Sequence, residues 1–368
     1  MSKAIRLAYA TIVLAGTLAA TAHATPPPPM PPMPPENAAF LATPEPVLES
    51  TGDPKVDAYR DKLLTDYTSK PWRPYLLRLL AGVRADPAII ERFDRLAAVR
   101  EPKDYVRHYV TPERIQRGRR LYRNLKKTSA IKLDEMPLEL RVALWGMLSD
   151  YGARRPQHDA LQALLVLGAY GKGGAEYEFQ LHHAASQILS GAVPRARLKA
   201  YATGKLGQTH TPAARFPDWA RDGNGDGRID IWSNRADILA TIAGNSWEGY
   251  AGIPVAVAVK VPTFDPKDPG EARMLQALNA SPNVPPGILE RWDGRAWTPE
   301  ERGHGSTYIP AFVKGGPAYV MLRPAWPVNS HDPILPMYAG SDTDMGFALA
   351  ASLLADAIAG RPLPPLPR

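Results

Sequence analysis

Cysteine is absent from this chain of 368 residues. Its absence excludes disulfide bonds, zinc sites with thiolate ligands, a thiol nucleophile and a lipid anchor on cysteine. Beyond the N-terminal segment, no apolar run reaches the length of about 18 residues that a membrane span needs, so we expect no membrane anchor. The sequence holds no phosphate-binding glycine loop and no nucleophile elbow. Its basic residues form no dense run, which argues against a nucleic-acid partner.

Proline, in contrast, is abundant. The chain has 39 prolines, and many of them lie in two tracts, TPPPPMPPMPPE at 25–36 and RPLPPLPR at the C-terminus. This share is roughly twice the usual one. Apolar residues make up 45% and charged residues 22% of the chain, as in ordinary globular proteins. The formal net charge of +7 favours an anionic partner, such as a cell-wall polymer, lipopolysaccharide or a membrane surface.

The N-terminus has the three parts of a secretory signal peptide. Lys3 and Arg6 are the basic residues, an apolar stretch follows from 7 to 20, and Ala22 and Ala24 form an A-x-A cleavage site. The alternative is a membrane anchor, but this stretch is shorter than the roughly 20 residues of a span. We therefore expect residues 1–24 to be removed on export. Residues 25–50 are predicted to be an extended Pro-rich linker.

The remaining pattern is mainly helical. We expect short, proline-punctuated helices over 51–130, and a core over 131–247 with helices at 137–152, 158–171 and 176–191, each ended by glycine. A small β-containing region over 248–325 should hold strands at 255–262 and 317–324, and residues 326–368 a closing helix at 346–360. His182 and His183 have no partner at metal-ligand spacing, so they are expected to be solvated or to line a groove.

The segment DGNGDGRID at 222–230 matches the first nine positions of an EF-hand loop. We expect it to bind Ca²⁺ through the side chains of Asp222, Asn224 and Asp226 and the backbone carbonyl of Arg228. Position 12 is serine instead of glutamate, so Asp237 is the candidate for closing the coordination sphere, and the affinity is expected to be weak. The alternative is a surface turn without an ion.

Five segments, in order, resemble lytic murein transglycosylases of the B type, glycoside hydrolase family 103. The run GQTHTPAARFPDWARDGNGDGRIDIW at 207–232 is similar to the family segment that ends in D-x-[DNS]-x-D-G-x-x-[DN]-[IL]-W. The other four are residues 93–122, VALWGMLSDYG at 142–152, GPAYVMLRP at 316–324, and FALAASLLADAIAG at 347–360. The resemblance spans roughly residues 55 to 362.

This resemblance implies a periplasmic protein with a lysozyme-like helical core, an added helical domain, a small β region and a calcium-binding loop. The family cleaves the bond between N-acetylmuramic acid and N-acetylglucosamine in peptidoglycan and leaves a 1,6-anhydro ring. One glutamic acid acts first as acid and then as base. The carried-over positions imply that Tyr151, Gln208, His210 and Trp232 contact the glycan strand.

The sequence departs from the family where the chemistry takes place. In the resemblance, Leu148 occupies the position of the catalytic glutamate, and leucine has no proton to transfer. His210 stands at a groove glutamine, Thr211 at the phenylalanine that follows, and the segment 201–207 is one residue longer. A groove tyrosine after residue 243 has no counterpart.

Three hypotheses follow. The first is a catalytically degenerate family member that still holds a glycan strand. The second is an active lytic transglycosylase with a relocated acid, for which the candidates are Asp150 and His210. The third is a scaffold or regulator that presents its Pro-rich tracts to cell-wall enzymes.

Overall fold

The structure is a computed structural model that describes residues 42–66, 71–97, 102–127, 136–172, 175–243, 256–263, 265, 267–273, 289–302, 306–309, 316–322, 341–364 and 366. The predicted signal peptide and residues 25–41 of the predicted linker lie outside this part. Among the described residues, no helix has the length and apolarity needed to cross a membrane.

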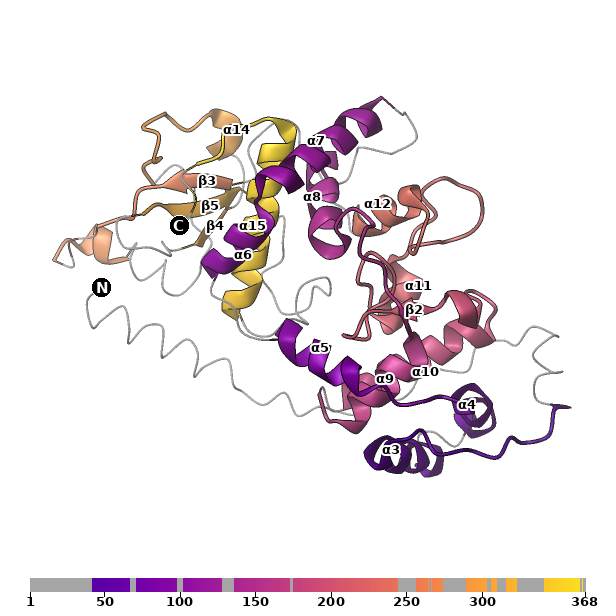
Figure 1. Ribbon diagram of the computed structural model, residues 1–368. Helices are drawn as coiled ribbons and strands as arrows, with labels where there is room; N and C mark the ends of the chain where they lie inside the picture. Colours follow the sequence, from indigo (N-terminus) through magenta and orange to yellow (C-terminus); the bar gives the residue numbers. More distant parts are fainter. Residues whose placement is uncertain are drawn as a thin grey trace. The chain divides into compact units, whose positions relative to one another are not determined.

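Two compact units divide the chain, and each is assembled from separate stretches (Figure 1). Among the described residues, unit 1 contains those from 102 to 151 and from 256 to 366, and unit 2 contains those from 42 to 97 and from 152 to 243. The regions predicted at 51–130 and 131–247 are therefore each shared between the units. The linear sequence pattern could not show this, because it places helices along the chain but does not say which of them pack together.

Unit 2 is built around α9 (Ala160–Ala169), which packs against α3 (Pro54–Thr65), α4 (Arg73–Leu80), α5 (Pro87–Ala97) and α10 (Ala175–Leu189). Helix α9 is apolar on nearly all sides. Its residues from 160 to 167 are buried except for the half-buried Gln162. Short elements complete the unit: β1 (His158–Asp159) pairs antiparallel with β2 (Lys199–Ala200), and α11 (Phe216–Trp219) and α12 (Arg235–Ala243) flank the EF-hand-like loop.

Unit 1 is built around α15 (Ser341–Ala359), which packs against α6 (Pro102–Tyr109), α7 (Pro112–Lys126) and α8 (Leu138–Ser149). Its three-stranded antiparallel sheet has the order β3-β5-β4, with β3 (Ala256–Val259), β5 (Ala318–Leu322) and β4 (Ser306–Ile309). The sheet has a small core of its own that includes Val259, Trp297 and Val320, and the short helix α14 (Pro299–Arg302) lies nearby in the chain. Strands β3 and β5 confirm the two predicted strands, whereas β4 was not predicted.

Prolines and capping side chains set the beginnings of the helices, as the sequence pattern predicts. Helices α3, α5, α6 and α7 each begin at a proline, whose missing N–H is not needed in a first turn. The Asp53 carboxylate caps α3, and Asp159 Oδ1 accepts the backbone N–H of Gln162 at 3.1 Å to cap α9. The helix predicted at 158–171 therefore starts two residues later than expected, because its first two residues form β1.

His182 lies in the interior of unit 2 and not at its surface. It is 1% exposed, its Nδ1 lies 2.9 Å from the carbonyl oxygen of Glu178, and its ring meets Trp72 edge-on at 5.6 Å. Burial lowers its pKa below the ordinary value of 6.5. The prediction of a solvated or groove-lining histidine is wrong for His182, because this face of α10 packs into the core of unit 2.

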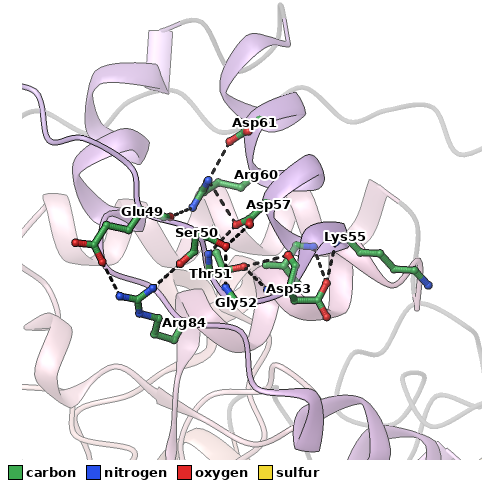
Figure 2. A network of polar contacts seen from close by, with 11 residues as sticks. Glu49, Ser50, Thr51, Gly52, Asp53, Lys55, Asp57, Arg60, Asp61 and Arg84 are labelled. Carbon is green, nitrogen blue, oxygen red and sulfur yellow. Dashed lines mark hydrogen bonds and ion pairs between the residues drawn. The ribbon is translucent and has the colours of Figure 1, made fainter.

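The last residues of the predicted linker are bound to unit 2 (Figure 2). Arg84 donates to the Ser50 carbonyl oxygen and to the Glu49 carboxylate, both at 2.5 Å, and the nearly buried Arg60 donates to the Glu49 carbonyl oxygen at 2.8 Å. Asp57 accepts the Ser50 hydroxyl at 2.6 Å and the backbone N–H of Thr51 at 2.7 Å. The stretch from 49 to 51 is therefore an anchored part of unit 2. Arg78 of α4 also donates to the Thr43 carbonyl oxygen at 2.5 Å, so the described end of the predicted linker is held at more than one point.

Candidate functional site

Helix α8 carries the position that the family resemblance assigns to the proton-transfer group. Leu148 lies there, in the last turn of the helix, and is 4% exposed. From Val142 to Ser149 the sequence holds no ionisable side chain, and all eight residues are buried. Helix α8 packs against α7 and α15, and its residues 142–149 are part of the core of unit 1. They therefore offer no acid or base.

Asp150, two residues further on, is the first candidate for a relocated acid. It ends α8 in the left-handed region, with φ of 52°, and Tyr151 follows with φ of 55°. Its carboxylate accepts two hydrogen bonds from Arg117 Nη1, at 3.0 and 2.9 Å, and Arg117 Nη2 donates to its carbonyl oxygen at 3.0 Å. A charge-assisted contact of this kind holds the carboxylate on the arginine. The helix predicted to reach Gly152 therefore ends at Ser149.

Tyr151, which is predicted to contact glycan, is nearly buried within unit 1. Its hydroxyl donates to the Arg114 carbonyl oxygen at 2.9 Å, and its ring meets Trp145 edge-on at 6.0 Å. Burial raises the pKa of its hydroxyl. A Cβ on Gly146 would lie 2.4 Å from this ring, so glycine at 146 makes room for it. These contacts stabilise the turn after α8.

Three other predicted glycan-contacting residues lie in unit 2 and come close together there. Gln208 is buried and its Nε2 donates to the Trp232 carbonyl oxygen at 2.7 Å. Trp232 in turn donates from Nε1 to the Lys199 carbonyl oxygen at 2.7 Å. His210 has a φ of 54°, and its ring lies against that of Tyr201 with centroids 4.1 Å apart. The structure thus joins Gln208 to Trp232 directly, and places His210 beside an aromatic ring that the sequence analysis did not single out.

A pocket of about 300 Å³ opens beside the same tyrosine, entirely within unit 2. It is lined by Arg92, Arg95, Arg155, Gln157, His158, Tyr201 and Ala202. Arg92 Nη1 lies 3.1 Å from His158 Nε2, and Asp86 lies 3.6 Å from His158 Nδ1. Burial lowers the pKa of His158. Sequence reasoning missed this pocket, because its arginines come from segments about 60 residues apart in the chain.

The EF-hand-like loop between α11 and α12 closes on itself through carboxylates. Asp222 accepts the backbone N–H groups of Gly225 at 2.6 Å and Gly227 at 2.7 Å. The fully buried Asp237 accepts those of Gly223 at 2.8 Å and Asp230 at 2.7 Å, one on each oxygen. Asp237 therefore ties the two ends of the loop together.

The donor set of this loop only partly suits a calcium ion. The side chains of Asp222, Asn224 and Asp226 present oxygen atoms on an accessible loop, as a hard cation requires. Arg228 is exposed, and its backbone N–H donates to Asp226 Oδ1 at 2.8 Å. Asp237 fits less well, because its carboxylate is fully buried and tied to the backbone N–H groups of Gly223 and Asp230, whereas that of Asp222 is partly exposed. Within the described ranges, no group of three or more acidic or histidine residues converges as a metal site would require.

Lys205 is a second feature that the sequence analysis missed. It lies in the segment 201–207, and it is 1% exposed. Its ammonium nitrogen has no hydrogen-bond partner among the described residues. Burial lowers its pKa to about 7, and the charge of Glu176 opposes this shift.

Similarity to known protein families and solved structures bears on the family and the fold of this chain, independently of the site geometry. Residues 64–313, well over half of the chain, match the family described as transglycosylase SLT domain. No curated protein matches the sequence. Among solved structures, SltB3 of Pseudomonas aeruginosa in complex with NAG-NAM-pentapeptide has a TM-score of 0.60 and 24% identity, covering 83% of this chain and 79% of that one.

Two further structures share the fold at lower identity. SltB1 of Pseudomonas aeruginosa has a TM-score of 0.58 and 19% identity, covering 83% of this chain and 99% of that one. Slt35 of Escherichia coli in complex with calcium has a TM-score of 0.56 and 17% identity, covering 83% and 93%. These likenesses confirm the mainly helical, lysozyme-like fold predicted from the sequence. By the match over residues 64–313, the chain belongs to the transglycosylase SLT domain family.

Proposed function

We propose that this protein binds the glycan strands of peptidoglycan in the periplasm and does not cleave them. Membership of the transglycosylase SLT domain family supports the class of ligand. SltB3, which shares the fold, has been crystallised with NAG-NAM-pentapeptide. The partner of this chain is accordingly a peptidoglycan strand.

The observation that carries the loss of catalysis is Leu148. The family reaction needs one group that gives a proton to the leaving oxygen and then takes one from the attacking hydroxyl. Leucine can do neither, and the neighbouring turn of α8 holds no ionisable residue that could act in its place.

The alternative, an active enzyme with a relocated acid, has less support. Asp150 is held by Arg117 through both carboxylate oxygens, and its backbone carbonyl is bonded to the same side chain. To act as a general acid, it would have to leave this ion pair and acquire a proton. His210 lies against the ring of Tyr201, with the ring centroids 4.1 Å apart. In the resemblance, neither residue stands at the position of the family acid, which Leu148 occupies.

Two further parts of the proposal concern the chain outside the glycan site. The N-terminal pattern supports export with cleavage after Ala24. The loop at 222–237 supports weak binding of Ca²⁺, with Asp222, Asn224 and Asp226 as the side-chain ligands. The Pro-rich tracts remain the basis of the third hypothesis, docking to cell-wall enzymes, for which the described residues add no observation.

Sedimentation with insoluble peptidoglycan tests the proposed binding. The full mature chain is mixed with purified peptidoglycan and centrifuged, and the pellet is compared with one from chitin, which has no muramic acid. We expect the protein to pellet with peptidoglycan and stay in solution with chitin. Protein that stays in the supernatant in both cases would contradict the proposal and favour the scaffold hypothesis.

A further inference from the structure

The pocket in unit 2 brings three arginines to one concave surface. Arg92 and Arg95 come from α5, and Arg155 comes from the loop before β1. No Asp or Glu is among the described residues that line it. The ring of Tyr201 and the methyl group of Ala202 give it an apolar wall, and Gln157 adds an amide. The lining therefore combines positive charge with apolar surface and a neutral hydrogen-bonding group.

Carboxylates near the pocket neutralise little of the positive charge of its three arginines. Among the described residues, Arg95 pairs only with Glu91, at 3.5 Å, and both side chains are about two thirds exposed, so this contact is weak. Arg155 donates from Nε to the Gly152 carbonyl oxygen at 3.4 Å and forms no ion pair within the described part of the chain. Arg92 faces His158 instead of a carboxylate. A guanidinium group recognises a carboxylate through two parallel hydrogen bonds.

The position of the pocket indicates which molecule carries the anionic group that the arginines would bind. Tyr201 lines the pocket and also lies against His210, a residue predicted to contact the glycan strand. A ligand in the pocket would therefore be next to a strand bound at His210. The peptides that branch from peptidoglycan strands carry carboxylates and amides, which match the arginines and Gln157, whereas an inorganic anion would leave the apolar wall without a contact.

We propose that this pocket binds the carboxylates of the peptide stem that branches from a peptidoglycan strand. The inference rests on the proposed function for the strand itself, but the peptide alone should also bind. Arg92, Arg95 and Arg155 are the groups that would recognise it, and Tyr201 would border both the peptide and the sugar.

Calorimetric titration of the full mature chain tests this with three probes: NAG-NAM-pentapeptide, the same disaccharide without peptide, and the free pentapeptide. The variant is Arg92→Gln/Arg95→Gln. The control is Arg73→Gln/Arg215→Gln, which removes the same charge from exposed positions of unit 2 outside the pocket. We expect the pentapeptide to tighten binding of the disaccharide by about tenfold or more, since bonds to charged groups are the strong ones. This gain should disappear in the variant and persist in the control.

The probes separate failure of this inference from failure of the proposed function. Equal affinity for the disaccharide with and without peptide would overturn the inference and leave strand binding intact. If neither disaccharide binds, the proposed function fails, and arginine-dependent binding of the free pentapeptide would still support the pocket. Amidating the pentapeptide carboxylates should abolish its binding to the wild-type protein. Phosphate that binds as tightly as the pentapeptide, with the same arginine dependence, would also overturn the inference.

Discussion

At the scale of single residues, Lys205 combines a buried position with an ammonium group. Desolvation favours the neutral amine, which is why its pKa falls from 10.5 to about 7. Between these two values the unfolded chain binds more protons than the folded one. The free energy of unfolding should therefore rise with pH across this window, and the cost of burying Lys205 is largest below about pH 7.

Replacing Lys205 with methionine should stabilise the protein. Methionine has a similar volume and carries no charge to desolvate, so Lys205→Met should raise the free energy of unfolding at pH 7 by on the order of 3 kcal/mol. It should also flatten the rise between pH 7 and 10.5. Urea unfolding at several pH values measures both effects. Lys62→Met, at a side chain that is 70% exposed, is the control and should change stability by less than about 0.5 kcal/mol. A less stable Lys205→Met protein would mean that the ammonium group has a stabilising partner.

At the scale of elements, the loop at 222–237 packs its backbone against α12. A Cβ on Gly223 would lie 2.1 Å from the Ala236 carbonyl oxygen, which is part of the backbone and cannot move aside. A Cβ on Gly225, two residues later, would meet nothing within 4 Å, although its φ of 75° disfavours other residues. The two glycines are therefore required for different reasons, one for space and one for conformation.

Because the two glycines are required for different reasons, replacing each of them with alanine should destabilise the protein to a different extent. Gly225→Ala should cost about 1–2 kcal/mol, the penalty of a left-handed residue with a side chain. Gly223→Ala should cost more, about 3 kcal/mol or above, because the loop must separate from α12. Thermal unfolding of the two variants beside the wild type gives the comparison. Equal losses would show that the loop does not pack on α12 in this way.

Calcium should act through the exposed part of the same loop. A ligand that binds only the folded state stabilises it by about 2.7 kcal/mol at one hundred times its Kd. We therefore expect millimolar Ca²⁺ to raise the Tm, and Asp226→Ala to remove most of that rise while changing the Tm in chelator only slightly. Asp237→Ala should lower the Tm even in chelator, because two backbone N–H groups lose their acceptor. The same Tm with calcium and with chelator would contradict calcium binding.

The sequence indicated most elements but not how they end or where they pack. Periodicity and prolines placed the helices, since these are local signals. The end of α8 was missed, because Asp150 and Tyr151 adopt left-handed conformations that only tertiary contacts with Arg117 and Arg114 support. Strand β4 was missed, because it lies in HGSTYIP at 304–310, among glycine and proline residues whose composition is typical of loops. The arginine pocket was missed, because its arginines come from segments about 60 residues apart in the chain.

At the scale of the whole molecule, the division into two units places the predicted site residues in both. Leu148, Asp150 and Tyr151 belong to unit 1, and Gln208, His210 and Trp232 belong to unit 2. The departures that the resemblance implies fall in both units, at Leu148 and at His210. The other segments that resemble the family include those that form α15 and β5. This pattern is what we expect of a chain that keeps its fold and has lost its chemistry.

Export determines whether the protein meets peptidoglycan at all. The N-terminal pattern predicts that the mature protein begins at Thr25 and is released into the soluble periplasmic fraction. N-terminal sequencing of the protein recovered from that fraction checks both points. A retained Met1, or recovery of the protein in the membrane pellet, would contradict them.

Analysis of the products released from purified peptidoglycan tests the central claim most directly. Wild-type protein, Leu148→Glu and an active relative are incubated with it, and 1,6-anhydro-muropeptides are quantified by mass spectrometry. A positioned acid contributes about 10²–10⁴-fold, so the wild type should release none above background. Leu148→Glu should recover activity only in part, because His210 and the other departures leave the sugar poorly positioned. Release by the wild-type protein at a rate like that of the active relative would contradict the account.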